Sequence, residues 1–323
     1  MGKYFPKEII IELTNTCNFV CSFCYKNASA KGTFISEHII GSLDKMIRGR
    51  VKKIMFTGGE PTIYPNFSQF VEQFSEYEQI SMVTNGSELY KIERDVLKHF
   101  SMIQFSLYGS NDEEYRITTG IQDGFTRLQK SVEVVKTEGI PFTIAITISE
   151  KTMDRVDDYI MAAIRLGAKT LAIGVADPFG RGINTYLRNK EYNKKKDAFI
   201  KQLVTYKKKY QDKIVVILNN IHVEEHSDER MKKMVYSNCL KCGSGVDSWV
   251  VSQEGRVRPC VYLPEKEFDI GGLDALKQYI DGEFQKEKLC QAVREYYRVE
   301  QFMENGIIPC NAIQQYYEEF VQD

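Results

Sequence analysis

The sequence contains no apolar run long enough to cross a bilayer, and residues 1–6 form no apolar signal segment. A membrane-spanning helix needs about 20 consecutive apolar residues, so the sequence argues against a transmembrane protein. Myristoylation at Gly2 is not expected either, because Pro6 occupies the position where that signal requires Ser or Thr. We therefore expect a cytoplasmic protein that does not bind membranes.

A surplus of positive charge is also missing. The 43 Lys and Arg residues are balanced by 44 Asp and Glu residues, which leaves a formal net charge of −1. Nucleic-acid binding relies on a basic surface that neutralises phosphates, so we expect no nucleic-acid partner. The lysine clusters at 194–196 and 207–209 have helical spacing with apolar residues between them, and we interpret them as the solvated face of a helix.

The chain does have the length and apolar content of a large globular protein. Its 323 residues, 43% of them hydrophobic, suffice for one large α/β domain and a smaller appendage. We place the larger domain at residues 1–210 and the smaller one at residues 211–323. Eight cysteines in a cytoplasmic protein favour metal or redox chemistry over disulfides, because that compartment keeps thiols reduced.

Strand-like and helix-like segments alternate through the first half of the chain. This alternation predicts a parallel sheet whose right-handed crossovers are helices. A Rossmann-like layer and a curved partial barrel both fit, and in either fold the site lies at the carboxyl ends of the strands. The pattern stops at a turn-rich boundary, 177–182. We predict strands at 8–13, 52–57, 79–84, 101–107, 142–149 and 170–175, and helices at 36–48, 66–76, 88–98, 125–138 and 153–166.

Three of the cysteines, Cys17, Cys21 and Cys24, lie in one short loop directly after the first predicted strand. Thiolates are soft ligands that select zinc, copper(I) or an iron–sulfur cluster. Structural zinc requires a fourth ligand nearby, whereas the nearest histidine is His38 and the next cysteine is Cys239. Buried free cysteines are the alternative. Three ligands on a four-iron cluster would leave one iron open.

The spacing C-x3-C-x-aromatic-C closely resembles the cluster loop of the radical S-adenosylmethionine (SAM) enzymes. The resemblance implies an α/β fold, a partial (β/α)6 TIM-like barrel, with a [4Fe–4S] cluster whose open iron chelates SAM. It also implies one-electron cleavage of SAM to a 5′-deoxyadenosyl radical, which removes hydrogen from a substrate. By the same resemblance, Phe23 lies against the adenine of SAM and Tyr25 lies near it.

A glycine-rich segment follows the second predicted strand. Gly58 and Gly59 let the backbone approach a ligand closely, Pro61 restricts the turn, and Glu60 supplies a carboxylate beside it. Alone, such a segment could be only a turn. After a three-cysteine loop it is similar to the glycine-rich element whose backbone contacts the amino group of SAM in the family.

Polar residues also follow the third and fourth predicted strands. Thr84 and Asn85 end the third strand and Ser106 lies near the end of the fourth, at places that resemble family positions facing the ribose and methionine parts of SAM. An Asn-Gly pair is also a common turn, which is the alternative for Thr84 and Asn85. Arg116 could meet the SAM carboxylate as a bidentate donor or form a surface ion pair.

The other five cysteines lie in the C-terminal third of the chain. Residues 248–252 and 256–259 have the pattern of a hairpin. This hairpin would bring Cys260 back toward Cys242. The arrangement is similar to the opening of the SPASM or twitch extension of radical SAM enzymes, a small α+β domain with auxiliary [4Fe–4S] clusters; a zinc ribbon is the rival. Cys290 is left as a core residue, a replacement ligand or a hydrogen donor. We assign one auxiliary cluster to Cys239, Cys242, Cys260 and Cys310.

The resemblance thus implies a radical SAM oxidoreductase with SAM and two [4Fe–4S] clusters as cofactors. We expect its substrate to be a ribosomally synthesised precursor peptide that receives a crosslink, a thioether or an epimerised residue. A small-molecule dehydrogenase is the alternative within the family. A non-catalytic cluster carrier is the alternative from another class, although a carrier needs no SAM pocket. Expected partners are a reductant such as flavodoxin or ferredoxin and a separate leader-peptide-binding protein.

Overall fold

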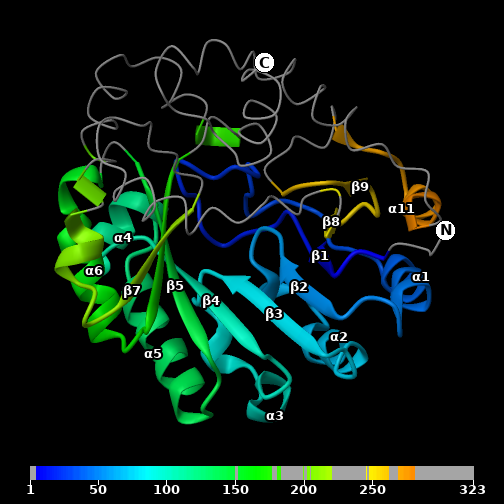
Figure 1. The fold of residues 1–323 in the computed structure, drawn as a ribbon, viewed down its shortest axis with the longest axis horizontal. Coiled ribbons are helices and arrows are strands. Elements are labelled where there is room, and N and C mark those ends of the chain that lie inside the picture. The colour runs from blue at the N-terminus through cyan, green and yellow to red at the C-terminus, as the bar shows by residue number, and fades with distance from the viewer. Residues whose placement is uncertain are drawn as a thin grey trace.

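The computed structural model of the chain describes residues 5–149, 152–176, 180–182, 199, 202–203, 205–219, 245, 247–261 and 268–280. These residues form one curved sheet, and the helices lie along its outer side (Figure 1). The strand order is β7-β6-β5-β4-β3-β2-β1-β8-β9. Each neighbouring pair is parallel except β8 and β9, which are antiparallel. The fold is a mostly parallel α/β sheet of the partial-barrel type, as predicted.

The six predicted strands are all present, and none of their ends differs by more than one residue from the expected one. They are β1 (Glu8–Glu12), β2 (Lys53–Thr57), β3 (Gln79–Thr84), β4 (Met102–Leu107), β5 (Phe142–Ile148) and β6 (Thr170–Val175).

Three further strands come from the C-terminal part of the chain and extend both edges of the sheet. They are β7 (Val215–Asn219), β8 (Ser248–Val251) and β9 (Val257–Arg258). β7 pairs with β6, and β8 pairs with β1 so that Ile9 lies beside Trp249. The predicted hairpin is present as β8 and β9. The described residues after 211 therefore continue the sheet of the larger domain on both sides.

The helices of the described residues largely follow the predicted pattern. The N-terminus of the first is capped by Ser36, whose hydroxyl accepts a hydrogen bond from the Ile39 amide at 3.3 Å. None of them is long and apolar enough to span a membrane. The α-helices are α1 (Glu37–Ile47), α2 (Phe67–Gln73), α3 (Arg94–Leu97), α4 (Asp112–Thr119), α5 (Gly124–Thr137), α6 (Val156–Arg165) and α11 (Leu273–Ile280).

Two helix predictions were wrong. The single helix expected at 88–98 is divided into the 3-10 turn η2 (Leu89–Lys91) and α3, because Ile92 and Glu93 between them are extended, with ψ of 142° and 138°. Helix α4 was not predicted. It begins at an Asn111 cap that accepts from the Glu114 amide at 3.0 Å and ends at Gly120 in the left-handed region.

Aromatic packing fixes α2 against the sheet. Phe56 of β2 is fully buried, and its ring centroid lies 4.6 Å from that of Phe70 and 5.7 Å from that of Phe74. Phe100 closes the cluster from the segment before β4, at 6.0 Å. Rings at these separations stabilise through both area burial and edge-to-face contact. This core holds the ends of β2 to β4, and thus the loops that follow them, in place.

Candidate active site

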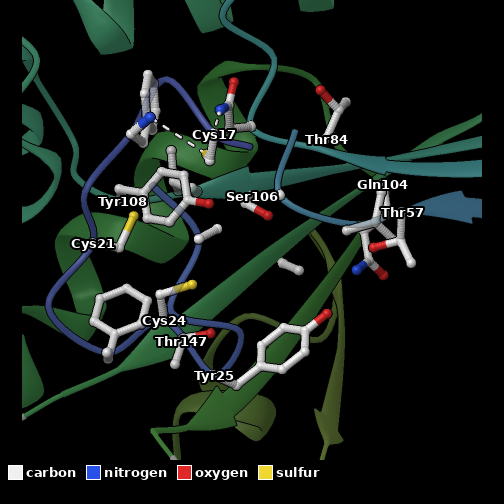
Figure 2. Close-up of a pocket in the computed structure, with 18 of the residues that line it drawn as sticks. Cys17, Cys21, Cys24, Tyr25, Thr57, Thr84, Gln104, Ser106, Tyr108 and Thr147 are labelled. Carbon is white, nitrogen blue, oxygen red and sulfur yellow. Dashed lines mark hydrogen bonds between the residues drawn. The ribbon is translucent and has the colours of Figure 1, made fainter. Parts of the chain in front are cut away.

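A cavity opens at the carboxyl ends of β1 to β6, where the fold class predicts a site. Its volume is about 210 Å³, and it is partly open to solvent. Cys17, Cys21 and Cys24 lie on one side of it, and Thr57 and Gln104 lie on the other (Figure 2). The sheet thus brings the three-cysteine loop and the polar strand ends together around one space.

Backbone hydrogen bonds hold the cysteine loop at its first and last cysteines. The Cys17 amide donates to the Ser29 carbonyl at 2.8 Å, and the Cys24 amide donates to the Cys21 carbonyl at 3.2 Å. Cys17 and Cys21 are buried, with 9% and 7% of their surface exposed, and Cys24 is half-buried. All three are free thiols.

The surroundings of these thiols disfavour bare thiolates. Burial, with the neighbouring Glu60 carboxylate and Cys24, raises the pKa of Cys17 to about 12. Burial also raises the pKa of Cys21, and the adjacent Cys17 and Cys24 raise it further. Thiolates can persist in such a place when they are bound to metal cations. The donor set therefore fits a metal cluster.

Three thiols in one loop suit a cluster, in which each cysteine binds its own iron. The described side chains include no group of three or more His, Cys, Asp or Glu residues gathered for one metal ion. A [4Fe–4S] cluster needs no such group, because its cysteines bind separate iron atoms. Three cysteines in one loop match three corners of that cluster and leave the fourth for another ligand.

Glu60 lies beneath the cavity and does not line it. The side chain is fully buried, and Oε1 accepts from the Thr62 amide and hydroxyl at 3.1 and 2.5 Å and from the Thr84 hydroxyl at 2.6 Å. Oε2 accepts from the Asn85 amide at 2.7 Å. Burial raises the pKa of Glu60, and these hydrogen bonds oppose that rise. Both oxygens are occupied, so Glu60 positions the third strand end.

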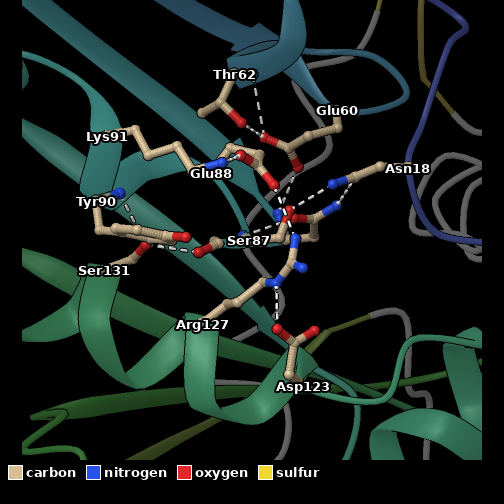
Figure 3. A network of polar contacts seen from close by, with 12 residues as sticks. Asn18, Glu60, Thr62, Ser87, Glu88, Tyr90, Lys91, Asp123, Arg127 and Ser131 are labelled. Atoms are coloured by element: carbon tan, nitrogen blue, oxygen red, sulfur yellow. Dashed lines mark hydrogen bonds and ion pairs between the residues drawn. The ribbon is translucent and has the colours of Figure 1, made fainter.

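The network continues from Asn85 into the cysteine loop. Asn85 Nδ2 donates to Asn18 Oδ1 at 2.9 Å and to Cys17 Sγ at 3.8 Å. Asn18 in turn donates to the Ser87 hydroxyl at 2.7 Å. Figure 3 shows Glu60, Asn18 and Ser87 near α5, whose Ser131 and Arg127 bond to the Gly86 carbonyl and to Glu88. The turn after β3 is thus joined to the first cysteine by side-chain hydrogen bonds.

The two glycines after β2 pack against the start of the cysteine loop. A Cβ at Gly58, whose φ is +139°, would lie 2.4 Å from the Thr14 carbonyl oxygen, and one at Gly59 would lie 2.0 Å from the Thr16 carbonyl oxygen. The Gly59 amide donates to the Thr14 carbonyl oxygen at 2.6 Å. Only glycine permits this approach. These residues line the cavity and also hold the loop.

The structure brings most of the predicted SAM-binding residues to the cavity. Pro61 is buried in the 3-10 turn η1 (Pro61–Ile63) and is absent from the lining, as is Glu60. Arg116 lies on the exposed side of α4, where it pairs with Glu113 at 2.7 Å, the surface ion pair that the sequence left open. The predicted residues that do line the cavity are Phe23, Tyr25, Gly58, Gly59, Thr84, Asn85 and Ser106.

Several lining residues escaped the sequence reading. Gln104 and Tyr108 share a face of β4 and its extension with Ser106, and the alternation that singled out Ser106 would have found them. Tyr108 packs beside Phe23 with ring centroids 6.2 Å apart. Burial raises its pKa well above the ordinary value, and the neighbouring Cys21 and Cys17 add to this, so it remains a neutral phenol. Arg181 lines the cavity from a turn after β6.

Of the cysteines assigned to an auxiliary cluster, Cys260 is described. It follows β9 and is half-buried. The other residues named for that region lie outside the described residues. They are Cys239, Cys242, Cys290 and Cys310.

The first part of the chain is similar to a known protein family. A family model for the Radical SAM superfamily matches residues 11–160, which run from β1 into α6 and contain the cysteine loop. The chain is 26% identical over 274 residues to the antilisterial bacteriocin subtilosin biosynthesis protein AlbA of Bacillus subtilis (strain 168), an alignment that covers 83% of this chain. The chain spans only 57% of the length of AlbA.

Two further proteins are similar to most of the chain: one is a curated relative and the other is a solved structure. A probable GTP 3′,8-cyclase of Sulfurisphaera tokodaii is 25% identical over 302 residues, which is 91% of this chain and 91% of the cyclase. The crystal structure of Streptococcus suis SuiB bound to S-adenosylmethionine is similar with a TM-score of 0.64 at 14% identity, over 87% of this chain and 66% of SuiB. At that identity the likeness shows the fold alone. The segment that matches the Radical SAM superfamily model is thus the one that contains the cysteine loop.

Proposed function

We propose that this chain binds a [4Fe–4S] cluster and SAM in the cavity and acts as a radical SAM enzyme on a peptide. The observation that carries the proposal is the loop of Cys17, Cys21 and Cys24 facing a cavity at the strand ends. When bound, the cluster and SAM supply a hydrogen-abstracting radical through one-electron cleavage of the sulfonium.

The chain's own residues would bind and orient these groups. The three cysteines hold three irons. The packed rings of Phe23 and Tyr108 offer an apolar surface to a planar base. Ser106 and Thr84 offer hydroxyl groups to the sugar and amino-acid parts of SAM from neighbouring strands. The backbone at Gly58 and Gly59 completes the cradle.

A peptide substrate is favoured by the charge of the lining. Among the described lining residues Arg181 is the single cation, and its Nε and Nη1 already donate to backbone carbonyls. Ala145, Ala172 and Gly174 leave room on β5 and β6. A lining with a single cation and several small side chains suits a peptide. The printed name of AlbA, a bacteriocin biosynthesis protein, and a solved structure of SuiB bound to precursor peptide SuiA point the same way.

A nucleotide substrate is the second candidate, because the alignment with the GTP 3′,8-cyclase covers 91% of both chains. A triphosphate requires several cationic donors, which the described lining does not present. Equilibrium dialysis of the SAM-loaded protein against GTP separates the two candidates. We expect no binding at millimolar GTP, and saturable binding would replace the peptide proposal with a nucleotide one.

We also propose an auxiliary [4Fe–4S] cluster on Cys239, Cys242, Cys260 and Cys310, with Cys290 outside it. A flavodoxin- or ferredoxin-like reductant would supply the electron, and a separate protein could present the leader peptide. Iron analysis after anaerobic reconstitution tests the second cluster. We expect about eight irons per chain, whereas about four would remove the auxiliary cluster from the proposal.

The assay for the central proposal is production of 5′-deoxyadenosine. Reconstituted protein with dithionite and SAM should form it, and Cys→Ala substitution at Cys17, Cys21 or Cys24 should abolish it. Cys260→Ala is the matched control, because it removes a thiol outside the loop and should leave some cleavage. A wild-type protein that holds its iron yet never cleaves SAM under strong reductant would refute the proposal.

A further inference from the structure

A short turn after β6 contacts the cysteine loop across more than 150 residues of sequence. This is the 3-10 turn η4 (Gly180–Gly182), in the segment where the sequence indicated only the turn-rich end of the strand–helix pattern. The Arg181 amide donates to the Cys24 carbonyl at 2.9 Å. The turn therefore touches the backbone of a cluster ligand directly.

The Arg181 side chain spans the loop on both sides of that contact. Nε donates to the Cys21 carbonyl at 2.7 Å, and Nη1 donates to the Ala28 carbonyl at 2.8 Å. A planar guanidinium can make both bonds at once because its donors have a rigid, forked geometry. Together with the amide, Arg181 makes three hydrogen bonds to the loop.

The remaining donor of this side chain is buried and lacks a hydrogen-bond partner among the described residues. Arg181 Nη2 makes no such bond, although the side chain lines the cavity. A buried donor without an acceptor is costly, and the cost is relieved when a negatively charged group lies nearby. The two sides of this arginine are thus suited to different tasks: one holds the loop, and the other leaves positive charge at the cavity.

Gly180 makes this contact possible. Its φ is +52°, and a Cβ there would lie 2.3 Å from the Tyr25 carbonyl oxygen and 2.4 Å from that of Cys24. Backbone oxygens cannot move aside as a flexible side chain can. A larger residue at this position would push the turn away from the loop.

We propose that Gly180 and Arg181 are positioning residues that hold the three-cysteine loop in its ligating conformation and keep a permanent positive charge beside the cluster. The inference deepens the proposed cluster binding and rests on it. Reduction adds one negative charge to the cluster. A fixed cation at short range in a partly buried site stabilises the reduced form and raises the reduction potential.

Three variants test the two roles. Arg181→Gln removes the positive charge and the paired guanidinium donors, and Arg181→Lys keeps the charge without the paired donors. Arg116→Gln is the control, because Arg116 is exposed and does not line the cavity. The readouts are iron per chain after anaerobic reconstitution and the reduction potential from a titration followed by electron paramagnetic resonance. Circular dichroism checks that each variant is folded.

We expect Arg181→Gln to lower the ratio of reduced to oxidised cluster at least tenfold at a given applied potential, a shift of about 59 mV for one electron. Arg181→Lys should retain the wild-type potential but bind less iron, and Arg116→Gln should match the wild type in both. A folded Arg181→Gln protein with wild-type iron and potential would overturn the inference. So would Arg181→Lys and Arg181→Gln proteins with equal potentials.

Gly180→Ala provides an independent test of the contact. It leaves the charge in the sequence but should lower the iron content relative to the wild type, and an unchanged iron content would refute the role of the turn. Failure of the proposed function has a different signature, because in that case the wild-type protein itself would assemble no cluster or cleave no SAM.

Discussion

A buried group of three charged side chains, Glu12, Lys26 and Arg258, joins the cysteine loop to the C-terminal hairpin. Substitution of its one carboxylate tests how much this group stabilises the fold. Glu12 at the end of β1 is fully buried. Its Oε1 lies 2.6 Å from Arg258 Nη2 on β9, and its Oε2 lies 2.6 Å from Lys26 Nζ. Arg258 also donates from Nε to the Cys260 carbonyl at 3.2 Å. We predict that Glu12→Gln strongly destabilises the fold.

The magnitude follows from the burial of all three partners. The Lys26 and Arg258 side chains are only 10% and 3% exposed, so the substitution leaves two desolvated cations without the carboxylate they share. Removing one partner of a buried ion pair costs about 3–5 kcal/mol. Typical domains are stable by about 5–15 kcal/mol in total, so the loss is a large fraction of the free energy of unfolding.

The pH dependence provides a second signature. Burial alone would raise the pKa of Glu12, but Lys26 and Arg258 together outweigh it and hold the pKa below its ordinary value. A carboxyl group with a lowered pKa in the folded state stabilises above its unfolded pKa, and this contribution disappears as pH falls through the folded value. The difference between wild type and Glu12→Gln should therefore be full at pH 7 and shrink below about pH 4.

The assay is urea denaturation followed by circular dichroism at pH 7 and at acid pH. Glu113→Gln is the matched control, because Glu113 pairs with Arg116 on an exposed surface, where an ion pair contributes about 0–1 kcal/mol. If the free energy of unfolding of Glu12→Gln lies within 0.5 kcal/mol of the control, roughly the size of a surface effect, the buried network does not hold the hairpin to the loop as described.

Two further substitutions address the site. Thr84→Val removes the hydroxyl that donates to Glu60 at 2.6 Å and should cost about 1–3 kcal/mol of unfolding free energy, because a buried acceptor loses a partner. Thr143→Val on β5, which β4 separates from β3, is the control, and equal losses would contradict this. Gly59→Ala places a Cβ 2.0 Å from the Thr16 carbonyl oxygen and should reduce iron binding after reconstitution. Gly41→Ala, at a glycine of α1 with open space around it and no positive φ, should retain iron. A Gly59→Ala protein with full iron would show that the loop tolerates displacement.

The cysteine loop and the strand order of the first half were predictable because their signals are local. The spacing of Cys17, Cys21 and Cys24 can be read within eight residues, and β-strand patterning depends on neighbours two positions apart. The same locality explains the errors. The helix expected at 88–98 has helical composition but an extended break, and α4 depends on capping by Asn111 rather than on a strong apolar pattern.

The roles of individual polar residues required the tertiary structure. Glu60 read as a cavity residue from its place in the sequence, yet it faces Thr62, Thr84 and Asn85 beneath the cavity. Arg116 read as a possible carboxylate ligand and lies on the far side of α4. A residue type and its strand position restrict where a side chain can be, but the direction of a loop decides which way it points.

The sequence by itself determined the alternating α/β order, through periodicity, and it led to the proposed cluster chemistry through three thiols at a strand end. Only the tertiary structure decided how the cysteine loop is held. Arg181 reaches Cys21 across 160 residues and Arg258 reaches Glu12 across 246, and both contacts exist because the curved sheet brings distant segments to one edge. Contacts at such separations depend on strand order and crossover geometry. The local sequence around each of the two residues does not encode that geometry, so these contacts could not be predicted from it.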